Sequence, residues 1–158
     1  MKIRLAEETD IDQLIQMRWD FTFEDKEYQV TDGVNLESFK SECRDFLASA
    51  VNSDLWFIWV AEVEEKIVAH IYIEIIQKVP RPGRITNPFA FMTNVYTIKD
   101  FRNKGIGSKL ITAINQWSKE RKCEFIIVWP SEDSIDYYKR NGYVHCEEPM
   151  EFFPSDLG

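Results

Sequence analysis

The chain has 158 residues and a formal net charge of −8, and no linker, repeat or low-complexity run divides it. One domain over residues 1–158 is therefore expected, and the acidic balance argues against nucleic acid as a partner, because phosphate binding needs a basic face. The longest apolar stretch, residues 55–61, is too short to span a bilayer, and the N-terminus lacks the apolar region of a signal peptide. These features predict a cytoplasmic protein without membrane contact.

The first third of the chain predicts one strand and two helices. Residues 2–5 form a short strand-like segment. Thr9 and Asn35 each precede a run of apolar residues at helical spacing, and both residue types are good helix caps. We expect Thr9 to cap the first helix and Asn35 to cap the second.

The middle of the chain predicts two long strands. Residues 55–63 and 66–76 are rich in β-branched and aromatic residues, and Glu64 and Glu65 join them. This pattern is typical of an antiparallel hairpin. Prolines and a glycine then mark residues 77–88 as a long connection.

The last part of the chain alternates strands and helices. Residues 89–98 and 125–129 predict strands, and an amphipathic helix follows the first of them. Residues 131–141 predict a short helix, and residues 143–153 are expected to pair as edge strands, with His145 among them. The order of elements indicates an α+β protein with a mixed, mostly antiparallel sheet and one parallel pair of strands.

A glycine-rich run, Arg-Asn-Lys-Gly-Ile-Gly at residues 102–107, lies between a predicted strand and a predicted helix. The first turn of a helix has backbone N–H groups without intrahelical partners, and the positive end of its dipole attracts anions. Gly105 and Gly107 leave room for the backbone to approach a ligand. Three cationic side chains surround the turn: Arg102, Lys104 and Lys109. We expect the run to bind a pyrophosphate.

The run fits neither of two common phosphate motifs. A Walker loop requires Gly-Lys-Ser/Thr, and a dinucleotide-binding fingerprint requires a third glycine where this chain has Leu110. The pattern Arg-x-x-Gly-x-Gly between a strand and a helix instead resembles the acyl-CoA-binding motif of the GNAT superfamily of N-acetyltransferases.

Residues 131–143 strengthen this resemblance. They are similar to the late helix of the superfamily, Asn-x-x-Ala-x-x-Phe-Tyr-x-x-x-Gly-Phe, with Ser131 in place of the asparagine and Ser134 in place of the alanine. Ser131 is expected to cap this helix and Gly142 to end it. By resemblance, Tyr138 protonates the departing CoA thiolate, since a phenol is protonated at neutral pH and can donate.

The resemblance covers nearly the whole chain and implies the GNAT fold, with about six to seven strands flanked by about four helices. It implies acetyl-CoA as cosubstrate, a small amine as acceptor, no metal, and a monomer or homodimer. The residues that the resemblance assigns to acetyl-CoA are Val95, Tyr96, Thr97, Arg102, Asn103, Lys104, Gly105, Ile106, Gly107, Ser108, Ser131, Ser134 and Tyr137.

Of the catalytic roles, the general base is the one that the sequence identifies least clearly. Residues 91–96 contain no carboxylate or imidazole. His70 and Glu74 share one face of a predicted strand and are candidate bases, with water as the alternative. The alternative for His70 is a partly buried histidine whose hydrogen bonds are satisfied, and the alternative for Glu74 is a surface or ion-pair role. Tyr72 and Asn94 are candidates for orienting the acceptor. The opposite face of the strand is apolar and predicts core: Ala69, Ile71, Ile73 and Ile75.

An acidic segment between the first two helices gives a second hypothesis about the acceptor. It contains Glu24, Asp25, Glu27 and Asp32. Such a cluster can raise the local concentration of a cationic amine by long-range attraction, or it can be an ordinary solvated surface.

Other chemistries lack support in the sequence. The chain has only two histidines and no nucleophile motif, and its three cysteines give neither a disulfide framework nor a zinc pattern. Three functions remain: an acetyl-CoA-dependent N-acetyltransferase for a small amine, a relative that uses another acyl group or a protein amine, and a CoA-binding regulatory module without catalysis.

Overall fold

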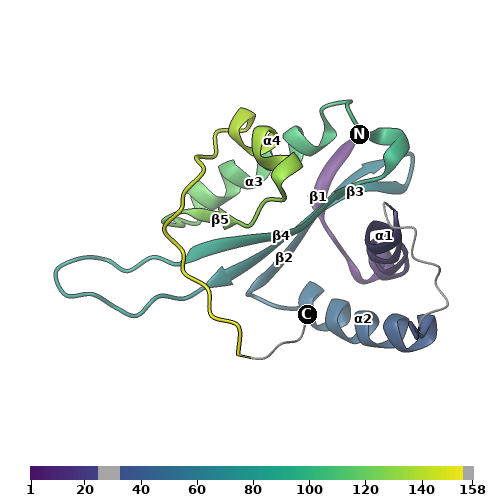
Figure 1. The fold of residues 1–158 in the computed structure, drawn as a ribbon, viewed down its shortest axis with the longest axis horizontal. Helices are drawn as coiled ribbons and strands as arrows, with labels where there is room; N and C mark the ends of the chain where they lie inside the picture. The colour runs from purple at the N-terminus through teal and green to yellow at the C-terminus, as the bar shows by residue number, and fades with distance from the viewer. Residues whose placement is uncertain (25–32, 155–158) are drawn as a thin grey trace.

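The computed structural model describes residues 1–24 and 33–154, and these ranges contain one five-stranded sheet (Figure 1). The strands lie side by side in chain order: β1 (Lys2–Leu5), β2 (Trp56–Val63), β3 (Lys66–Ile76), β4 (Phe89–Thr97) and β5 (Ile126–Val128). Neighbours from β1 to β4 are antiparallel, whereas β5 pairs with β4 in parallel. The predicted α+β class and mixed sheet are confirmed.

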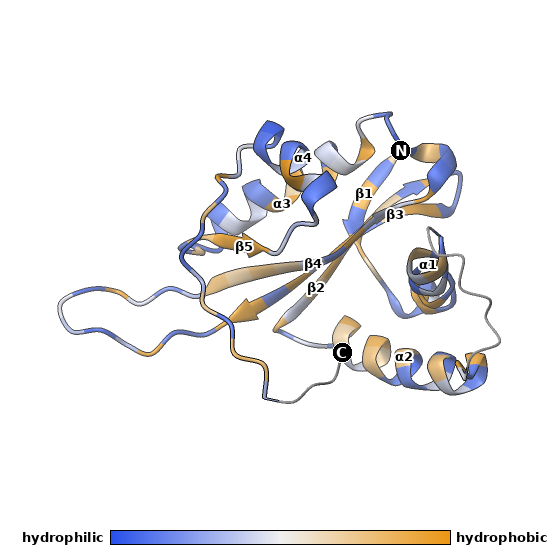
Figure 2. Cartoon of the chain, viewed as in Figure 1, coloured by the Kyte–Doolittle hydropathy of each residue, from blue (hydrophilic) through white to orange (hydrophobic). Residues whose placement is uncertain are grey.

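Helices cover both faces of the sheet (Figure 1). One face carries α1 (Ile11–Phe23) and α2 (Leu36–Val51), and the other carries α3 (Ile106–Glu120) and α4 (Ile135–Arg140). Apolar residues dominate the central strands and alternate with polar residues along the helices (Figure 2). No helix in the described ranges is both long and apolar enough to cross a bilayer.

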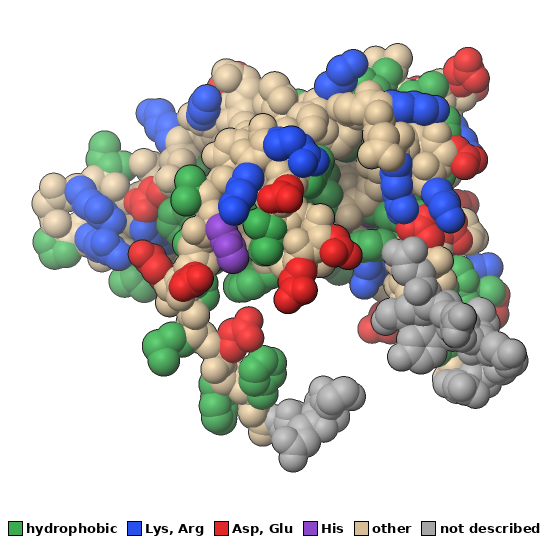
Figure 3. Space-filling view, turned by 45° about the horizontal axis from the view of Figure 1, so that its top comes forward, with side chains coloured by type: hydrophobic (Ala, Val, Ile, Leu, Met, Phe, Trp, Pro, Cys, Tyr) green, Lys and Arg blue, Asp and Glu red, His purple; other side chains and the backbone are tan. Residues whose placement is uncertain are grey.

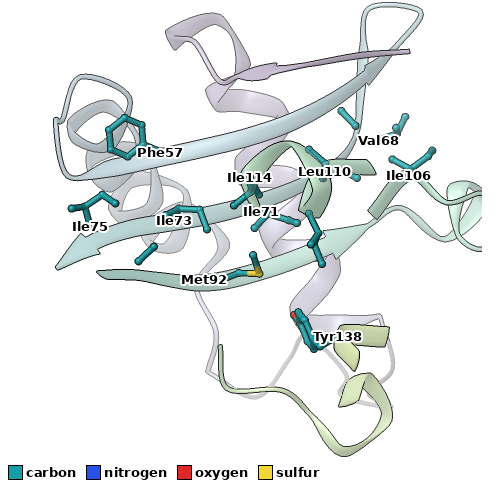
Figure 4. Close-up of a cluster of buried hydrophobic side chains, with 14 residues drawn as sticks. Phe57, Val68, Ile71, Ile73, Ile75, Met92, Ile106, Leu110, Ile114 and Tyr138 are labelled. Carbon is teal, nitrogen blue, oxygen red and sulfur yellow. The ribbon is translucent and has the colours of Figure 1, made fainter. Parts of the chain in front are cut away.

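The alternation along β3 separates two cores, of which the sequence predicted the one that contains Ala69, Ile71, Ile73 and Ile75. Ile71 and Ile73 pack with α3 residues such as Leu110 on one face (Figure 4). Tyr72, from the opposite set, belongs to the core under α1 and α2. The strand is buried on both faces because helices cover both, so its side chains read as a nearly continuous apolar run.

Two of the predicted helix caps have different outcomes. The Asn35 side chain accepts the backbone N–H groups of Glu37 and Ser38 at 3.0 and 3.1 Å, which confirms the cap of α2. The prediction for Thr9 is wrong. Asp10 occupies the start of α1 instead, and its carboxylate accepts the backbone N–H of Glu7 at 2.7 Å while pairing with Arg4 at 2.7 Å. A buried ion pair therefore fixes this helix end.

The predicted edge strands at residues 143–153 are absent from this part of the described chain, which leaves five strands instead of six to seven. After Gly142, whose φ is +89°, the segment follows an irregular path and exposes large apolar side chains such as Met150 and Phe152. Adjacent carboxylates and Pro149 disfavour a paired strand, because proline lacks the N–H that a ladder needs. β5 is also shorter than predicted, with 3 residues.

A β-bulge interrupts the pairing of β3 with β4. His70 lies opposite Tyr96 and Tyr72 lies opposite Thr93, so two residues of β4 oppose one of β3. Asn94 adopts a left-handed conformation there, with φ +48°. The pairing of β4 with β5 ends at Met92 and Val128, just before the bulge. The sheet therefore opens between these two strands.

Candidate active site

The main cavity lies where β4 and β5 separate. Its volume is about 970 Å³, and the start of α3 and the helix α4 line its sides. It brings together all but one of the residues that the sequence assigned to acetyl-CoA, along with Tyr138; the exception is Lys104. The Lys104 ammonium instead lies 5.0 Å from the centre of the Phe101 ring. Thus residues from distant parts of the sequence converge on one cavity.

Gly105 sets the geometry of the loop before α3. Its φ is +74°, in the left-handed region that glycine adopts at little cost, and its carbonyl accepts the N–H of Lys109 at 3.1 Å. The N–H groups of the first helical turn, Ile106 to Ser108, are left without intrahelical acceptors by the geometry of a helix start. Lys and Arg side chains on the α3 and α4 face are interspersed with acidic ones (Figure 3). The start of α3 therefore offers an anion backbone N–H groups and separate cationic side chains instead of a continuous basic patch.

Gly107 lies against the helix α4 as well as in the lining of the main cavity. A Cβ at this position would lie 2.6 Å from the Tyr137 hydroxyl oxygen, whereas a Cβ at Gly105 would meet nothing within 4 Å. The absence of a side chain at Gly107 thus leaves room for the Tyr137 hydroxyl beside the start of α3. The access of a ligand to the backbone of both glycines stays a prediction.

Glu24 is not among the residues that line either the main cavity or the second cavity, described below, which contains Tyr72 and Asn94. Its carboxylate pairs with the guanidinium of Arg102, and the Tyr96 hydroxyl donates to it at 3.2 Å. Arg102 also donates from Nε to the Thr97 carbonyl at 2.9 Å. The end of α1 is therefore tied to the glycine loop, and the charge of Arg102 is largely neutralised. The other acidic residues of this hypothesis, Asp25, Glu27 and Asp32, lie outside the described residues.

Replacing Glu24 with Gln is expected to raise the affinity for acetyl-CoA about two- to fivefold at low salt, because it removes a negative charge beside an anion site. Glu37→Gln on the surface of α2, where the side chain is 83% exposed, is the control and should leave affinity unchanged. Calorimetric titration at two salt concentrations measures both. A loss of affinity in Glu24→Gln would show instead that the ion pair holds Arg102 in place for the ligand.

The two serines of the late motif bond to each other. Ser131 Oγ donates to Ser134 Oγ at 3.1 Å, and Ser134 Oγ donates to the Ser131 carbonyl at 2.9 Å. Ser131 precedes a 3₁₀ turn, Glu132–Ser134, and makes no side-chain cap, so the predicted cap of the helix is wrong. Both serines still line the cavity.

Tyr138 lies at the edge of the core that α3 and the sheet form (Figure 4). Only 7% of the residue is exposed, and it lines the main cavity. Burial raises the pKa of its hydroxyl to about 12. The side chain is therefore a protonated donor at neutral pH, held in place by the rings of Tyr137 and Tyr143 at 5.1 and 5.7 Å.

The candidate bases lie away from both cavities described here. His70 is fully buried, and its Nδ1 lies 2.8 Å from the carbonyl oxygen of Asn94 in the bulge. A carbonyl only accepts, so Nδ1 carries the proton, and burial lowers the pKa of the imidazole to about 4. Glu74 lies between Trp56 and Phe91 on the neighbouring strands. His70 therefore anchors the bulge.

His70 is expected to make stability depend on pH. Its pKa falls from 6.5 to about 4 on folding, so the unfolded chain binds more protons between these values. The free energy of unfolding should then decrease by about 2 kcal/mol from pH 7 to pH 5. The His70→Gln variant should be less stable than wild type at pH 7. Its free energy of unfolding, measured by urea titration, should change less between pH 7 and pH 5. The exposed His145, changed to Gln, is the control. A wild-type profile that is flat from pH 7 to pH 5 would contradict this assignment.

A second cavity of about 590 Å³ lies between α1, α2 and the sheet. It contains the predicted acceptor residues Tyr72 and Asn94, and it shares Phe21, Thr93 and Asn94 with the main cavity, so the two meet at the bulge. The sequence did not assign several other lining residues to a site: Arg18, Phe39, Glu42, Phe46 and Trp56. The helical periodicity of α2 indicated only an apolar face, and this face serves as the wall of a cavity.

Comparison with known proteins agrees with this arrangement. Residues 11–143 match the Acetyltransferase (GNAT) family, and the chain belongs to this family. No curated protein matches the chain. Among solved structures, it is similar to a predicted acetyltransferase with acetyl-CoA from Clostridium acetobutylicum, with 22% identity, coverage of 96% of this chain and 95% of that chain, and a TM-score of 0.76.

Two further structures share the fold. Glucosamine-6-phosphate N-acetyltransferase from Arabidopsis thaliana is 22% identical, with 98% of each chain covered and a TM-score of 0.69. An aminoglycoside acetyltransferase from an uncultured soil metagenomic sample, in complex with sisomicin, is 23% identical, with 98% of this chain and 95% of that chain covered and a TM-score of 0.68. At these identities the similarity establishes the fold.

Proposed function

We propose that the protein is an acetyl-CoA-dependent N-acetyltransferase that transfers an acetyl group directly to a small primary amine. One observation carries the proposal: the cavity between the separating ends of β4 and β5 contains both the start of α3 and the Tyr138 side chain, and it meets a second cavity at the bulge. A thioester and an amine can approach each other at this junction from opposite sides.

The residues of the main cavity suit CoA. The free N–H groups at the start of α3 are donors for a pyrophosphate. Val95 belongs to the bulge, and Tyr96 and Thr97 follow it. We assign the backbone of these three residues to hydrogen bonds with the pantetheine arm, which contains two amide groups. Bound acetyl-CoA would supply the activated acyl group.

Tyr138 is the proposed donor to the leaving group. The amine nitrogen bonds to the carbonyl carbon of the thioester, the carbon–sulfur bond breaks, and the proton that the amine loses balances the one that the thiolate gains. A phenol with a pKa of about 12 is a weaker acid than a thiol of about 8.5, so complete transfer from Tyr138 is uphill by about 5 kcal/mol. The hydroxyl therefore stabilises the thiolate chiefly by a hydrogen bond, and solvent supplies the proton.

The proposed base is water. In the described part of the chain, the residues that line the two cavities include Glu42 and Asp133 as carboxylates and no histidine. His70 is held neutral but donates to Asn94, and it lies outside both linings. We therefore assign attack to the neutral fraction of the amine, which makes the rate rise with pH until the acceptor amine is deprotonated.

Release of free thiol from acetyl-CoA in the presence of primary amines tests the proposal. The panel contains amino acids, arylalkylamines, polyamines and aminoglycosides, with acetyl-CoA alone as the control for hydrolysis. Amine-dependent release is expected, together with an N-acetyl product in mass spectrometry. Tight CoA binding without turnover for any amine or acyl-CoA would identify a binding module instead. Faster turnover with a longer acyl-CoA would show that the protein transfers a longer acyl group than acetyl.

A further inference from the structure

Within residues 1–24 and 33–154, the second cavity has an aromatic lining with one cation and one anion. Its lining includes five aromatic side chains: Phe21, Phe39, Phe46, Trp56 and Tyr72. They come from α1, α2, β2 and β3, so four elements contribute rings to one space. A volume of about 590 Å³ is in the range of small-molecule sites.

Two of the rings that line the cavity keep free surface. Phe21 is 38% exposed and Phe46 is 41% exposed, although both lie against other aromatic groups. Phe46 contacts Trp56 edge to face, with ring centres 5.1 Å apart and planes at 84°. A ligand that carries an apolar or aromatic ring can extend this set of contacts. The free ring surface therefore points to an acceptor with a large apolar body.

Arg18 supplies the positive charge of the cavity. Its Nη1 donates to the side-chain oxygen of Asn94 at 3.2 Å, at the junction of the two cavities, and its guanidinium lies 5.5 Å from the centre of the Phe21 ring. The ion pairs found among the described residues involve other cations. The remaining donors of the guanidinium suit a carboxylate in a bidentate arrangement.

The charge of the lining disfavours a polycation. Among the described residues that line it, Glu42 is the single carboxylate, and Arg18 offsets it. A polyamine or aminoglycoside would place several ammonium groups against rings and a guanidinium, without enough carboxylates to replace their hydration. An amine that also carries a carboxylate meets an opposite charge at Arg18.

We infer that the acceptor is an α-amino acid with a large apolar or aromatic side chain, whose carboxylate binds Arg18 while its ring packs against Phe46 and Trp56. The inference rests on the proposed function and names the substrate class of the same site. The α-amine then lies at the junction near Thr93 and Asn94. It forms the new bond to the acetyl carbon, loses one proton, and leaves the N-acetyl amino acid and CoA thiol.

Calorimetric binding of L-phenylalanine to the full chain saturated with CoA tests the inference independently of turnover. L-phenylalaninamide lacks the carboxylate and L-alanine lacks the ring, and each is expected to bind about tenfold more weakly or worse. Arg18→Met should reduce the preference for L-phenylalanine over L-phenylalaninamide to about twofold. Arg44→Met removes a guanidinium outside the cavity, which pairs with Asp12 at 2.6 Å, and should keep the wild-type preference.

The outcomes separate this inference from the proposed function. Thiol release with kanamycin or spermidine, in the absence of phenylalanine binding, would overturn the substrate class and leave the transferase intact. Binding of phenylalanine that depends on Arg18, without thiol release, would uphold the binding site and overturn the transferase. An acid-to-amide ratio that Arg18→Met leaves unchanged would overturn the role of Arg18, provided that thermal unfolding shows a folded variant.

Discussion

Gly105→Asp is expected to abolish measurable binding of acetyl-CoA. Asp tolerates the left-handed conformation at φ +74° better than most residues, and a carboxylate at a helix N-terminus is compatible with the dipole, so the variant should fold. Its Cβ would meet no atom within 4 Å. The loss should therefore arise from the negative charge that faces the pyrophosphate at the start of α3.

Gly105→Asn is the matched control for this effect. It has the same shape and the same tolerance of the left-handed region without the charge, so calorimetry should show CoA affinity within about tenfold of wild type. Equal affinity of folded Gly105→Asp and wild type would contradict the phosphate assignment. Gly107 is a poor position for this test, because a Cβ there would lie 2.6 Å from the Tyr137 hydroxyl oxygen and Tyr137 would have to shift.

Tyr138→Phe is expected to lower kcat by up to about 10²-fold while keeping CoA affinity within a few-fold. The ring remains, so packing in the core is retained. The effect stays below that of a strong general acid, because the pKa of about 12 limits proton transfer and solvent partly substitutes. Steady-state kinetics with a working amine, combined with single-turnover measurements, separates chemistry from product release.

Tyr143→Phe is the control for removal of a nearby hydroxyl. The Tyr143 ring packs on Tyr138 at 5.7 Å, but its hydroxyl donates to Asn115 at 2.9 Å, away from the main cavity. We expect this variant to lose some stability and to keep kcat. Unchanged turnover in Tyr138→Phe, where chemistry limits the rate, would remove Tyr138 from the mechanism.

Short-range signals in the sequence predicted most of the fold. The period of two in β3, the turn at Glu64 and Glu65, and the cap at Asn35 depend on neighbours in the chain, and the structure confirms them. Predictions failed where a distant partner decides the local structure. The start of α1 uses an ion pair between Asp10 and Arg4 instead of a threonine cap, and residues 143–153 find no strand to pair with among the described residues.

The sequence by itself determined the GNAT family and the two motifs that line much of the main cavity, because the glycine loop and the late tyrosine helix are contiguous motifs whose backbone geometry follows from their residue types. Only the tertiary structure decided the acceptor side. Arg18 and Trp56 lie on different elements, and the fold of α1 and α2 against the sheet makes them walls of one cavity. The same packing pairs Glu24 with Arg102 and buries His70 against the bulge. Charge and spacing along the chain cannot reveal such contacts, because they depend on which faces the helices and strands turn toward one another.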